Sequence, residues 1–477
     1  MTLSVAFTTE VHAALTQHLV RFDRQEDLTF GLWLPSTGST RLTAIVQQPI
    51  LPLQGDRTVH GNAEYHPQYF ERALEEALAA GSGIVFTHSH PGPGWQGLSD
   101  DDYDTERQLA PACLAATRLP LLGMTLGSDG TWSARLWSKT RPKTYLPTWC
   151  ENVRVIGDGL RISFEPHVAP PRRFGPELNR TVSTWGPRLQ SHLVGARVGV
   201  VGVGSVGSLV AEGIARLGVR DILLMDYDRI ERVNLDRILH ATRTAARLRT
   251  PKVSMIGRAI RKSATATKPN IRTSRWSVCE PAGFAEALDC DVLFSCVDRP
   301  WSRQVLNFIA YAHLIPVIDG GIHALARPGG DGVRRADWFV QTAIAGRACL
   351  ECQGQYDPGL VAADREGRLD DPHYIEGLPN DHPGRRRENV FAFSMNVASF
   401  ELLQYLALFV LPGPLSDPGT QSYHFVPSLF EATHPRCLAH CPYVALTGKG
   451  DKTGLAVTGP HKVAEERRGG IGKRLRV

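Results

Sequence analysis

The sequence predicts an α/β multidomain protein, in which a small α+β domain precedes a Rossmann-like, doubly wound domain. With 477 residues the chain is too long to fold around one hydrophobic core, so several domains are expected. Short alternating apolar runs and one helical pattern occupy the first 140 residues, which favours an α+β domain. From Arg197 onward strand and helix patterns alternate, which is typical of a mostly parallel sheet.

The individual elements follow from the same periodicities. The predicted strands are Thr29–Leu34, Gly83–Thr87, Arg197–Val203, Asp221–Asp226, Asp291–Cys296 and Pro316–Asp319. The predicted helices are Gln68–Ala79, Val206–Leu217, Lys252–Ala264 and Pro300–Ala312.

Changes in composition set the domain boundaries. Six prolines between Arg141 and Pro176 indicate a linker that holds at most a short strand, Arg161–Phe164. Residues 357–388 are polar and rich in Gly, Pro and Asp, so a mobile excursion is expected there. The predicted segments are an α+β domain over 1–140, a Pro-rich linker over 141–176, a doubly wound domain over 177–446 and a flexible basic tail over 447–477.

Composition and charge narrow the class of protein. The net charge of +5 suits anionic ligands such as nucleotide phosphates, but it falls short of the basic stripe of a nucleic-acid binder. No signal peptide is visible, and the apolar stretch Val397–Leu411 is too short to span a bilayer. Nine cysteines, an odd number, argue against a disulfide scaffold and for a reducing compartment. The expected location is cytoplasmic, with neither nucleic acid nor membrane as a partner.

A candidate metal site lies in the segment HSHPGPGWQGLSDDD. His88 and His90 alternate with Ser89, so on an extended chain both imidazoles face the same way. Asp102, twelve residues beyond His90, can close a three-ligand site whose fourth position stays open for water. Bound zinc would lower the pKa of that water toward ~7, and a nearby Glu could then act as general base.

This segment resembles the JAMM/MPN+ (JAB) metallopeptidases, whose pattern is a distant Glu, then HxHP, then SxxD. The resemblance implies that His88, His90 and Asp102 bind a catalytic zinc ion and that Ser99 stabilises the tetrahedral oxyanion. The eight residues between His90 and Ser99 are one more than the family usually has. The alternative is a metal-free domain that only docks a partner.

The general base of that family is an early Glu on an apolar strand. Here Glu26 heads the segment EDLTFGLWL and is assigned as the base, with Asp27 as the alternative. Thr29 stands three residues after Glu26, where the family usually has Gly.

A glycine-rich loop opens the second domain. Gly202, Gly204 and Gly207 follow a predicted strand and precede a helix, so the backbone can approach phosphates at a helix N-terminus. Asp226 ends the next strand, where an acid would bond ribose hydroxyls. These features alone would also suit an NAD-dependent oxidoreductase.

The residues that follow favour nucleotidyl transfer over hydride transfer. Asp228, Asn234 and Arg237 lie just beyond the ribose acid in DYDRIERVNLDR, and Lys252 follows Pro251. Two cations and an amide suit the charge of a triphosphate. Asp298 ends a further strand, where a carboxylate could hold Mg²⁺ against the phosphates.

This combination resembles the ThiF/MoeB superfamily, which includes ubiquitin-activating enzymes, over about residues 170–445. The resemblance implies that Asp226 binds ribose, that Asp298 serves Mg²⁺ and that the substrate nucleotide is ATP. LNRTV resembles a short N-terminal family segment, so Arg180 would reach the nucleotide, in some members across a homodimer interface. A solvated surface arginine is the equal alternative. The phosphate-binding residues implied are Asn234, Arg237 and Lys252.

Two close cysteine pairs indicate a structural zinc site. Cys349 and Cys352 form CLEC, and Cys437 and Cys441 form CLAHC, where CxxC is usual. Many ubiquitin-activating enzymes use a cysteine between the two pairs, and this sequence has none there. The chain would therefore pass its acyl-adenylate to the thiol of a separate conjugating-enzyme-like partner; Cys279 is the alternative nucleophile.

Together the resemblances imply a bifunctional enzyme of a bacterial-type ubiquitin-like protein pathway, in some members linked to antiviral defence. One domain would adenylate the C-terminal glycine of a ubiquitin-like protein, and the other would trim its precursor or cleave its conjugates. The alternatives are activation of a sulfur-carrier protein, a JAMM domain that only docks, and a tRNA-modifying member of the superfamily. RRGG at Arg467–Gly470 is interpreted as part of the flexible tail.

Overall fold

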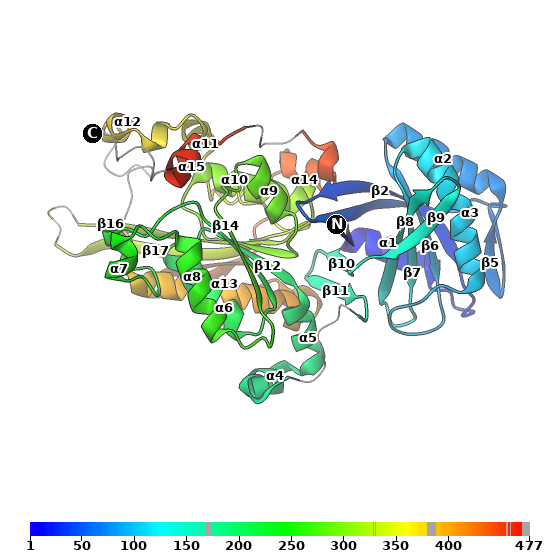
Figure 1. Ribbon diagram of the computed structural model, residues 1–477, viewed down its shortest axis with the longest axis horizontal. Coiled ribbons are helices and arrows are strands. Elements are labelled where there is room, and N and C mark those ends of the chain that lie inside the picture. The colour runs from blue at the N-terminus through cyan, green and yellow to red at the C-terminus, as the bar shows by residue number, and fades with distance from the viewer. Residues whose placement is uncertain are drawn as a thin grey trace. The chain divides into compact units, whose positions relative to one another are not determined.

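The computed structural model describes residues 1–167, 174–327, 329, 331–378, 388–454, 457 and 459–469. The chain divides into two compact units, each built on its own sheet (Figure 1). Unit 1 contains Met1–Ala169, Ala312–Leu314 and Leu446–Gly454, and unit 2 contains Pro170–Tyr311, Ile315–Ala445 and Leu455–Val477.

A nine-stranded mixed sheet forms the centre of unit 1, with a separate hairpin of β4 (Arg57–His60) and β5 (Asn62–Tyr65). Apolar side chains alternate between its two faces, and both faces are buried. In pairing order the strands are β11 (Leu160–Phe164), β10 (Asn152–Ile156), β1 (Thr2–Thr8), β3 (Arg41–Ile50), β2 (Leu28–Thr37), β6 (Gly83–Ser89), β7 (Leu121–Leu126), β8 (Trp132–Arg141) and β9 (Thr144–Trp149).

Three helices pack on this sheet. Val85 of β6 joins a core cluster with Leu15 and Leu19, which come from α1. Its neighbour Phe86 points the other way and joins a second cluster with Tyr69 of α2 and Leu109 of α3. The α+β prediction is therefore confirmed for unit 1. The helices are α1 (Thr9–Leu19), α2 (Pro67–Ala80) and α3 (Asp100–Thr117).

The structure differs from the predicted Pro-rich linker over 141–176. Residues 144–164 hold three strands, β9, β10 and β11, all of which belong to the sheet of unit 1. Of these, only the strand predicted at Arg161–Phe164 was expected, and it matches β11. The first domain therefore extends well beyond residue 140.

An eight-stranded sheet forms the centre of unit 2. Its first five strands run parallel in a doubly wound order, and the last three are antiparallel. The prediction of a Rossmann-like sheet is confirmed. In pairing order the strands are β14 (Asn270–Ser274), β13 (Asp221–Met225), β12 (Arg197–Val201), β15 (Val292–Ser295), β16 (Val317–Ala326), β17 (Val333–Ala343), β18 (Thr420–His424) and β19 (Leu429–Thr433).

Helices cover both faces of the parallel part. Figure 1 shows α9 and α10 on one face and α6, α8 and α13 on the other. The helices are α4 (Asn179–Trp185), α5 (Pro187–Gly195), α6 (Ser205–Arg216), α7 (Arg243–Arg247), α8 (Lys252–Ser263), α9 (Pro281–Ala287), α10 (Pro300–Ala312), α11 (Pro358–Arg365), α12 (Pro372–Glu376), α13 (Phe391–Val410), α14 (Pro442–Leu446) and α15 (Lys462–Gly469).

Two segments predicted to be mobile or flexible are folded where the structure describes them. Part of 357–388 forms α11 and α12, and Val361 and Asp364 of α11 are buried. The predicted basic tail over 447–477 forms α15, whose Ala464 is buried. Both segments obtain their order from long-range contacts, which local composition does not encode. Gly470 and the residues beyond it lie outside the described residues.

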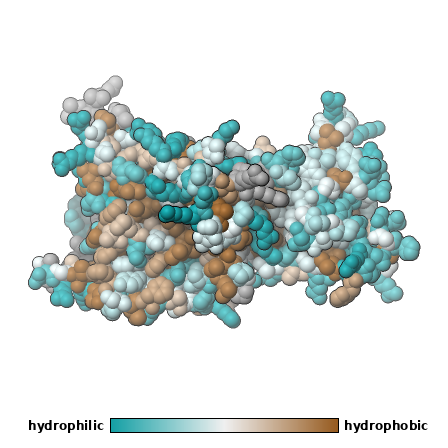
Figure 2. Space-filling model, turned by 90° about the horizontal axis from the view of Figure 1, so that it is seen from below, coloured by the Kyte–Doolittle hydropathy of each residue, from teal (hydrophilic) through white to brown (hydrophobic). Residues whose placement is uncertain are grey.

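Helix α13 is long and apolar enough to cross a membrane by length and composition alone. Half of that apolar window is buried, because α13 packs on α6, β16 and β17. Figure 2 shows apolar side chains gathered over unit 2. The exposed apolar residues include Met395 and Leu403 of α13. The helix thus serves as a core helix of unit 2, and its polar residues Glu401 and Gln404 are buried.

Candidate functional site

Three predicted zinc ligands converge in unit 1. His88 Nε2 lies 3.2 Å from Asp102 Oδ1, and His90 Nε2 lies 3.3 Å from Asp102 Oδ2. The two imidazole Nε2 atoms are 3.1 Å apart, and all three ligand atoms lie within 4.8 Å of one another. Two imidazoles and a carboxylate at this spacing fit a zinc ion that keeps a fourth position open.

The pairing of β2 with β6 places Glu26 beside this cluster. Leu28 pairs with His88, and the Ser89 amide donates to the Asp27 carbonyl at 3.0 Å. Continuing that register by two residues sets Glu26 opposite His90, on the same face of the sheet as Leu28 and His88. Hydrogen bonding to Asp102 raises the pKa of His90, and the charge of Glu26 adds to this effect. Glu26 is half-buried, so it can contact both the cluster and water.

Asp27 points away from the cluster and is held in an ion-pair network. Its side chain is 1% exposed and accepts from Arg57 Nε at 2.5 Å and from Arg21 Nη1 at 3.3 Å. Burial works against the carboxylate, but hydrogen bonds from Arg57 and the Leu28 amide outweigh it and lower the pKa of Asp27. This fixed role removes Asp27 as the alternative general base.

We expect Asp27→Asn to destabilise the full chain by about 2 kcal/mol at neutral pH, a value between those of buried and surface pairs. Because the folded pKa of Asp27 is depressed, its contribution is complete above the unfolded value of about 3.9 and is lost as pH falls further. Urea unfolding at pH 7 and pH 3 measures this difference. The difference in unfolding free energy between wild type and Asp27→Asn should be smaller at pH 3 than at pH 7. Glu26→Gln should not lower the unfolding free energy by a comparable amount at either pH.

Ser99 has a structural role that the sequence pattern did not reveal. It is the N-cap of α3: its hydroxyl accepts from the Asp102 amide at 3.1 Å, and its own amide donates to Asp102 Oδ2 at 3.0 Å. This capping box fixes the Asp102 carboxylate at the start of the helix. The hydroxyl proton is not used in the cap, so the predicted oxyanion contact by Ser99 stays a prediction.

The glycine loop of unit 2 lies at the carboxyl end of β12, where the doubly wound strand order reverses. Gly202 has φ +87°, and a Cβ there would collide with the Cys296 carbonyl. A Cβ on Gly207 would collide with the Gly202 carbonyl, so both positions require glycine. Helix α6 has Gly204 as its N-cap and no side-chain cap, which leaves backbone N–H groups directed outward for an anion.

Beside this loop, one lysine lies between two carboxylates. Lys252 Nζ is 2.9 Å from Asp228 Oδ2 and 3.8 Å from Asp226 Oδ2, and its side chain is 12% exposed. Asp226 accepts from the Val203 amide in the loop at 2.8 Å and from the Asp228 amide at 2.8 Å. The predicted ribose acid and phosphate cation are thus placed together by the ends of β12 and β13 and the start of α8.

The pKa values of this group follow from burial and mutual charge. Burial raises the pKa of Asp226. Desolvation of the partly buried Asp228 works against its carboxylate, but Lys252 and Arg467 hold its pKa below the usual value. Burial disfavours the Lys252 ammonium, yet Asp226, Asp228 and Asp298 together raise its pKa. The site therefore holds a permanent cation beside an acidic cluster.

The other predicted nucleotide residues lie in loops around this group. Asp298 is exposed in the loop after β15, close enough for its charge to act on Lys252 and Tyr227. Asn234 caps the short 3-10 helix η2 (Arg232–Asn234) by accepting from the Glu231 amide. Arg237 donates to Asp236 and to the Val233 carbonyl, and Arg180 is exposed on α4.

Sequence reasoning missed a second set of charges at this edge. Arg467 of α15 donates to Asp228 Oδ1 at 2.8 Å and to Asp370 Oδ1 at 3.3 Å. Asp370 in turn accepts from Arg299, the residue after Asp298, at 2.5 Å. The signal for Arg467 was present in the helix-forming segment KVAEERR, which the Gly-rich composition of the tail obscured.

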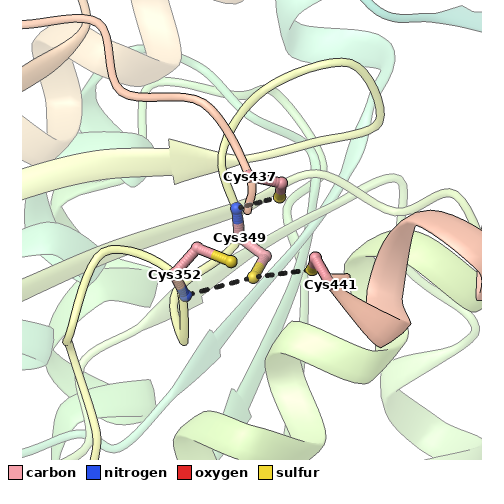
Figure 3. Close-up of side chains that lie close together, drawn as sticks. All are labelled: Cys349, Cys352, Cys437 and Cys441. Atoms are coloured by element: carbon pink, nitrogen blue, oxygen red, sulfur yellow. Dashed lines mark hydrogen bonds between the residues drawn. The ribbon is translucent and has the colours of Figure 1, made fainter. Parts of the chain in front are cut away.

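The four predicted cysteines come together in unit 2 (Figure 3). Their sulfur atoms lie within 4.8 Å of one another, and those of Cys349 and Cys441 are 3.6 Å apart. Backbone amides point at the sulfurs: Cys349 N lies 3.2 Å from Cys437 Sγ, and Cys352 N lies 3.3 Å from Cys349 Sγ. Amide donors around four thiolates suit a structural zinc ion, so the CxxxC spacing of the second pair is no obstacle.

We expect Cys349→Ser to remove one zinc ion per chain and to lower the thermal midpoint, because the metal would link the segment carrying Cys437 and Cys441 to the rest of unit 2. Metal analysis of the purified full chain measures the first effect. Cys113→Ala, which changes a buried cysteine of unit 1, is the matched control and should keep its zinc. Equal zinc contents in Cys349→Ser and wild type would contradict the assignment.

The remaining cysteines are poor nucleophiles. Burial raises the pKa of the Cys279 thiol to about 12, and Cys279 is fully buried. Cys296 lies beside the glycine loop, but burial and the nearby Glu401 raise its pKa well above the usual value. Neither thiol is ionised at neutral pH, so Cys279 is a poor candidate for the nucleophile that would form a thioester.

Comparison with known proteins agrees with the geometry of unit 2. Residues 177–371 match the model of the ThiF family. Ubiquitin-like modifier-activating enzyme 5 of Rattus norvegicus is 25% identical over 260 residues, which cover 50% of this chain and 57% of that protein. The adenylyltransferase and sulfurtransferase UBA4 of Meyerozyma guilliermondii is 30% identical over 161 residues, covering 33% and 35%. The matched residues thus span little more than half the length of the first of these curated relatives and about a third of the second.

Among solved structures, the crystal structure of E. coli MccB with ATP has a TM-score of 0.43 and 16% identity, covering 58% of this chain and 76% of that one. The ThiF match begins directly after Pro176, runs through β12 and α11 and ends just before α12. It includes the glycine loop, Asp226, Lys252 and Asp298. Residues 177–371 of this chain thus match the ThiF family, and the relatives of the chain in sequence include ubiquitin-like modifier-activating enzymes.

Proposed function

We propose that the chain uses MgATP to adenylate the C-terminal glycine of a ubiquitin-like protein. The observation that carries this proposal is the position of Lys252 between Asp226 and Asp228, directly beside the glycine loop of a ThiF-type domain. A hydride-transfer site has no need of a buried cation at that place. The names of the curated relatives, ubiquitin-like modifier-activating enzymes, support the same activity.

The reaction can be assigned to residues. An oxygen of the glycine carboxylate attacks the α-phosphorus of ATP, the bond from that phosphorus to the bridging oxygen breaks, and pyrophosphate leaves. The loop amides and the N-terminus of α6 bind phosphate oxygens, and Lys252 with Arg237 neutralises the developing charge. Asp226 binds the ribose, and Asp298 would hold the Mg²⁺ that shields the phosphates.

The activated glycine then needs an acceptor outside this chain. Cys279 is buried with a raised pKa, and no cysteine occurs between Cys352 and Cys437. The acyl-adenylate would pass directly to the thiol of a conjugating-enzyme-like partner. A homodimer, in which Arg180 reaches the nucleotide of the partner subunit, belongs to the same proposal.

The second proposed activity is zinc-dependent cleavage by unit 1 of the same ubiquitin-like protein, either from its precursor or from its conjugates. The convergence of His88, His90 and Asp102, with Glu26 opposite His90, supports it. Zinc held there would supply a Lewis acid and lower the pKa of bound water. Glu26 would take the proton of the attacking water and pass it to the departing amine.

ATP–pyrophosphate exchange tests the adenylation. The full chain is incubated with ATP, labelled pyrophosphate and ubiquitin-like proteins that end in glycine. Exchange should require the carrier and should disappear when its terminal glycine is deleted. Absence of exchange with every glycine-terminated carrier would exclude this function.

A sulfur-carrier protein is the second candidate substrate, because one relative is named adenylyltransferase and sulfurtransferase. The chemistry up to the acyl-adenylate is the same. The two candidate functions differ at the next step. A sulfur carrier would become a thiocarboxylate, whereas a ubiquitin-like modifier would form a thioester with a partner protein. Mass spectrometry of the carrier after the reaction distinguishes them.

A further inference from the structure

The C-terminal helix α15 is fixed against unit 2 by its last arginine. Arg468 donates to both carboxylate oxygens of Glu280, at 2.6 Å for the Nη2–Oε1 bond, and its guanidinium stacks 4.3 Å from the Trp276 ring. Glu280 is 4% exposed, so this bidentate pair is shielded from water. Arg275 donates to the Arg468 carbonyl at 3.2 Å. The end of α15 therefore has a defined position.

The segment that leads into α15 is fixed as well. His461 is buried, and its Nδ1 lies 3.0 Å from Ser277 Oγ. Its ring packs edge-on against Trp301 and Tyr227, at centroid distances of 5.0 and 5.5 Å. Tyr227 stands between the two nucleotide-site carboxylates in the sequence, so α15 lies directly beside that site.

This placement puts Arg467 and Lys252 on the same carboxylate. Lys252 Nζ contacts Asp228 Oδ2 at 2.9 Å, and Arg467 Nη1 contacts Asp228 Oδ1 at 2.8 Å. Lys252 is nearly buried, whereas the Arg467 side chain is 44% exposed. The two cations thus bind the two oxygens of one carboxylate, and Arg467 is the one that is open to solvent.

We propose that Arg467 is a further ligand for the triphosphate of ATP, supplied to the adenylation site by the C-terminal helix. The inference rests on the proposed function. Asp226, Asp228 and Asp298 make this edge acidic, so a polyanion needs more positive charge there than Lys252 alone provides. A guanidinium has five N–H donors, and the two bonds to Asp228 and Asp370 leave others to bind phosphate oxygens.

Nucleotide binding to the full chain tests this role. Titration calorimetry compares Mg·ATP with adenosine, which has the same base and ribose but no phosphate. Arg467→Ala should weaken Mg·ATP binding by about 10- to 100-fold, as for loss of a charge-assisted hydrogen bond, and leave adenosine binding unchanged. Arg467→Lys should recover part of the loss. Lys462→Ala removes an exposed cation from the same helix and should change neither affinity.

Each other outcome has a definite meaning. Equal weakening of ATP and adenosine would overturn the proposal, because it would show that Arg467 only shapes the site. Tighter ATP binding by Arg467→Ala would overturn it too, since α15 would then obstruct the nucleotide. If wild type binds ATP and Lys252→Ala weakens it but Arg467→Ala does not, only this inference fails. If wild type binds no ATP, the proposed function itself fails.

Discussion

Replacement of Lys252 by alanine is expected to lower ATP–pyrophosphate exchange by about 100- to 1,000-fold, the usual cost of removing one preorganised electrostatic contact from a transition state. The residue is 12% exposed and lies 2.9 Å from Asp228. Its loss removes the phosphate cation and also leaves the carboxylates of Asp226 and Asp228 facing the incoming triphosphate without their shared partner. We therefore expect weaker ATP binding and slower turnover together.

The matched control for this variant is Lys262→Ala. Lys262 is an exposed lysine near the end of α8, the helix that Lys252 begins. Its removal changes the net charge by the same amount and should leave exchange within about twofold of wild type. Lys252→Arg keeps the charge but exceeds the buried space, so partial activity is expected. Full exchange by Lys252→Ala would exclude the assignment of this site to phosphate binding.

The elements that carry the candidate nucleotide site could be predicted from sequence because most of their signals are local. Gly207 is required by a contact with the Gly202 carbonyl five residues earlier, Gly202 has a positive φ within the same turn, and Asp226 directly follows β13, the strand that pairs with β12. A turn that admits only glycine leaves the same pattern wherever it occurs. Four of the five parallel strands, β12, β13, β15 and β16, were predictable for a similar reason, because each is a short apolar run; the edge strand β14 has the mixed sequence NIRTS and was missed.

The linker was mispredicted because its strands have unusual compositions. Pro147 lies in β9, which forms one edge of the sheet, where a missing N–H group can be tolerated. Arg154 interrupts the apolar pattern of β10, yet its side chain is fully buried in the sheet. Because of this proline and this buried arginine, the sequence patterns of β9 and β10 were not recognised as strands.

The docked helix α15 was missed for a different reason. Its order depends on Arg468 and Glu280, which are 188 residues apart in the sequence. An eight-residue helix is marginal alone in water, and only such tertiary contacts stabilise it. In unit 1 the sequence pattern also gave only part of the role of Ser99. The pattern indicated an oxyanion contact, and the structure shows in addition that Ser99 caps α3.

Two substitutions in unit 1 are expected to separate zinc binding from catalysis. Asp102→Ala removes a ligand that lies 3.2 Å from His88 and 3.3 Å from His90, so the chain should lose the zinc of this site and all cleavage with it. Glu26→Gln keeps the ligands and should keep the zinc. Its amide cannot accept the proton of the attacking water, so cleavage should fall by about 10²- to 10⁴-fold.

Cleavage is measured on a linear fusion of a ubiquitin-like protein to a reporter, and zinc by metal analysis of the same preparations. Glu75→Gln, on the exposed side of α2, is the control for loss of a carboxylate from unit 1. Zinc content near wild type with cleavage lost is the combination that only a general base predicts. If Glu26→Gln cleaves at the wild-type rate, Glu26 is not the base. If wild type holds zinc and cleaves nothing, unit 1 acts by docking the ubiquitin-like protein, and the same three ligands would then stabilise the docking surface.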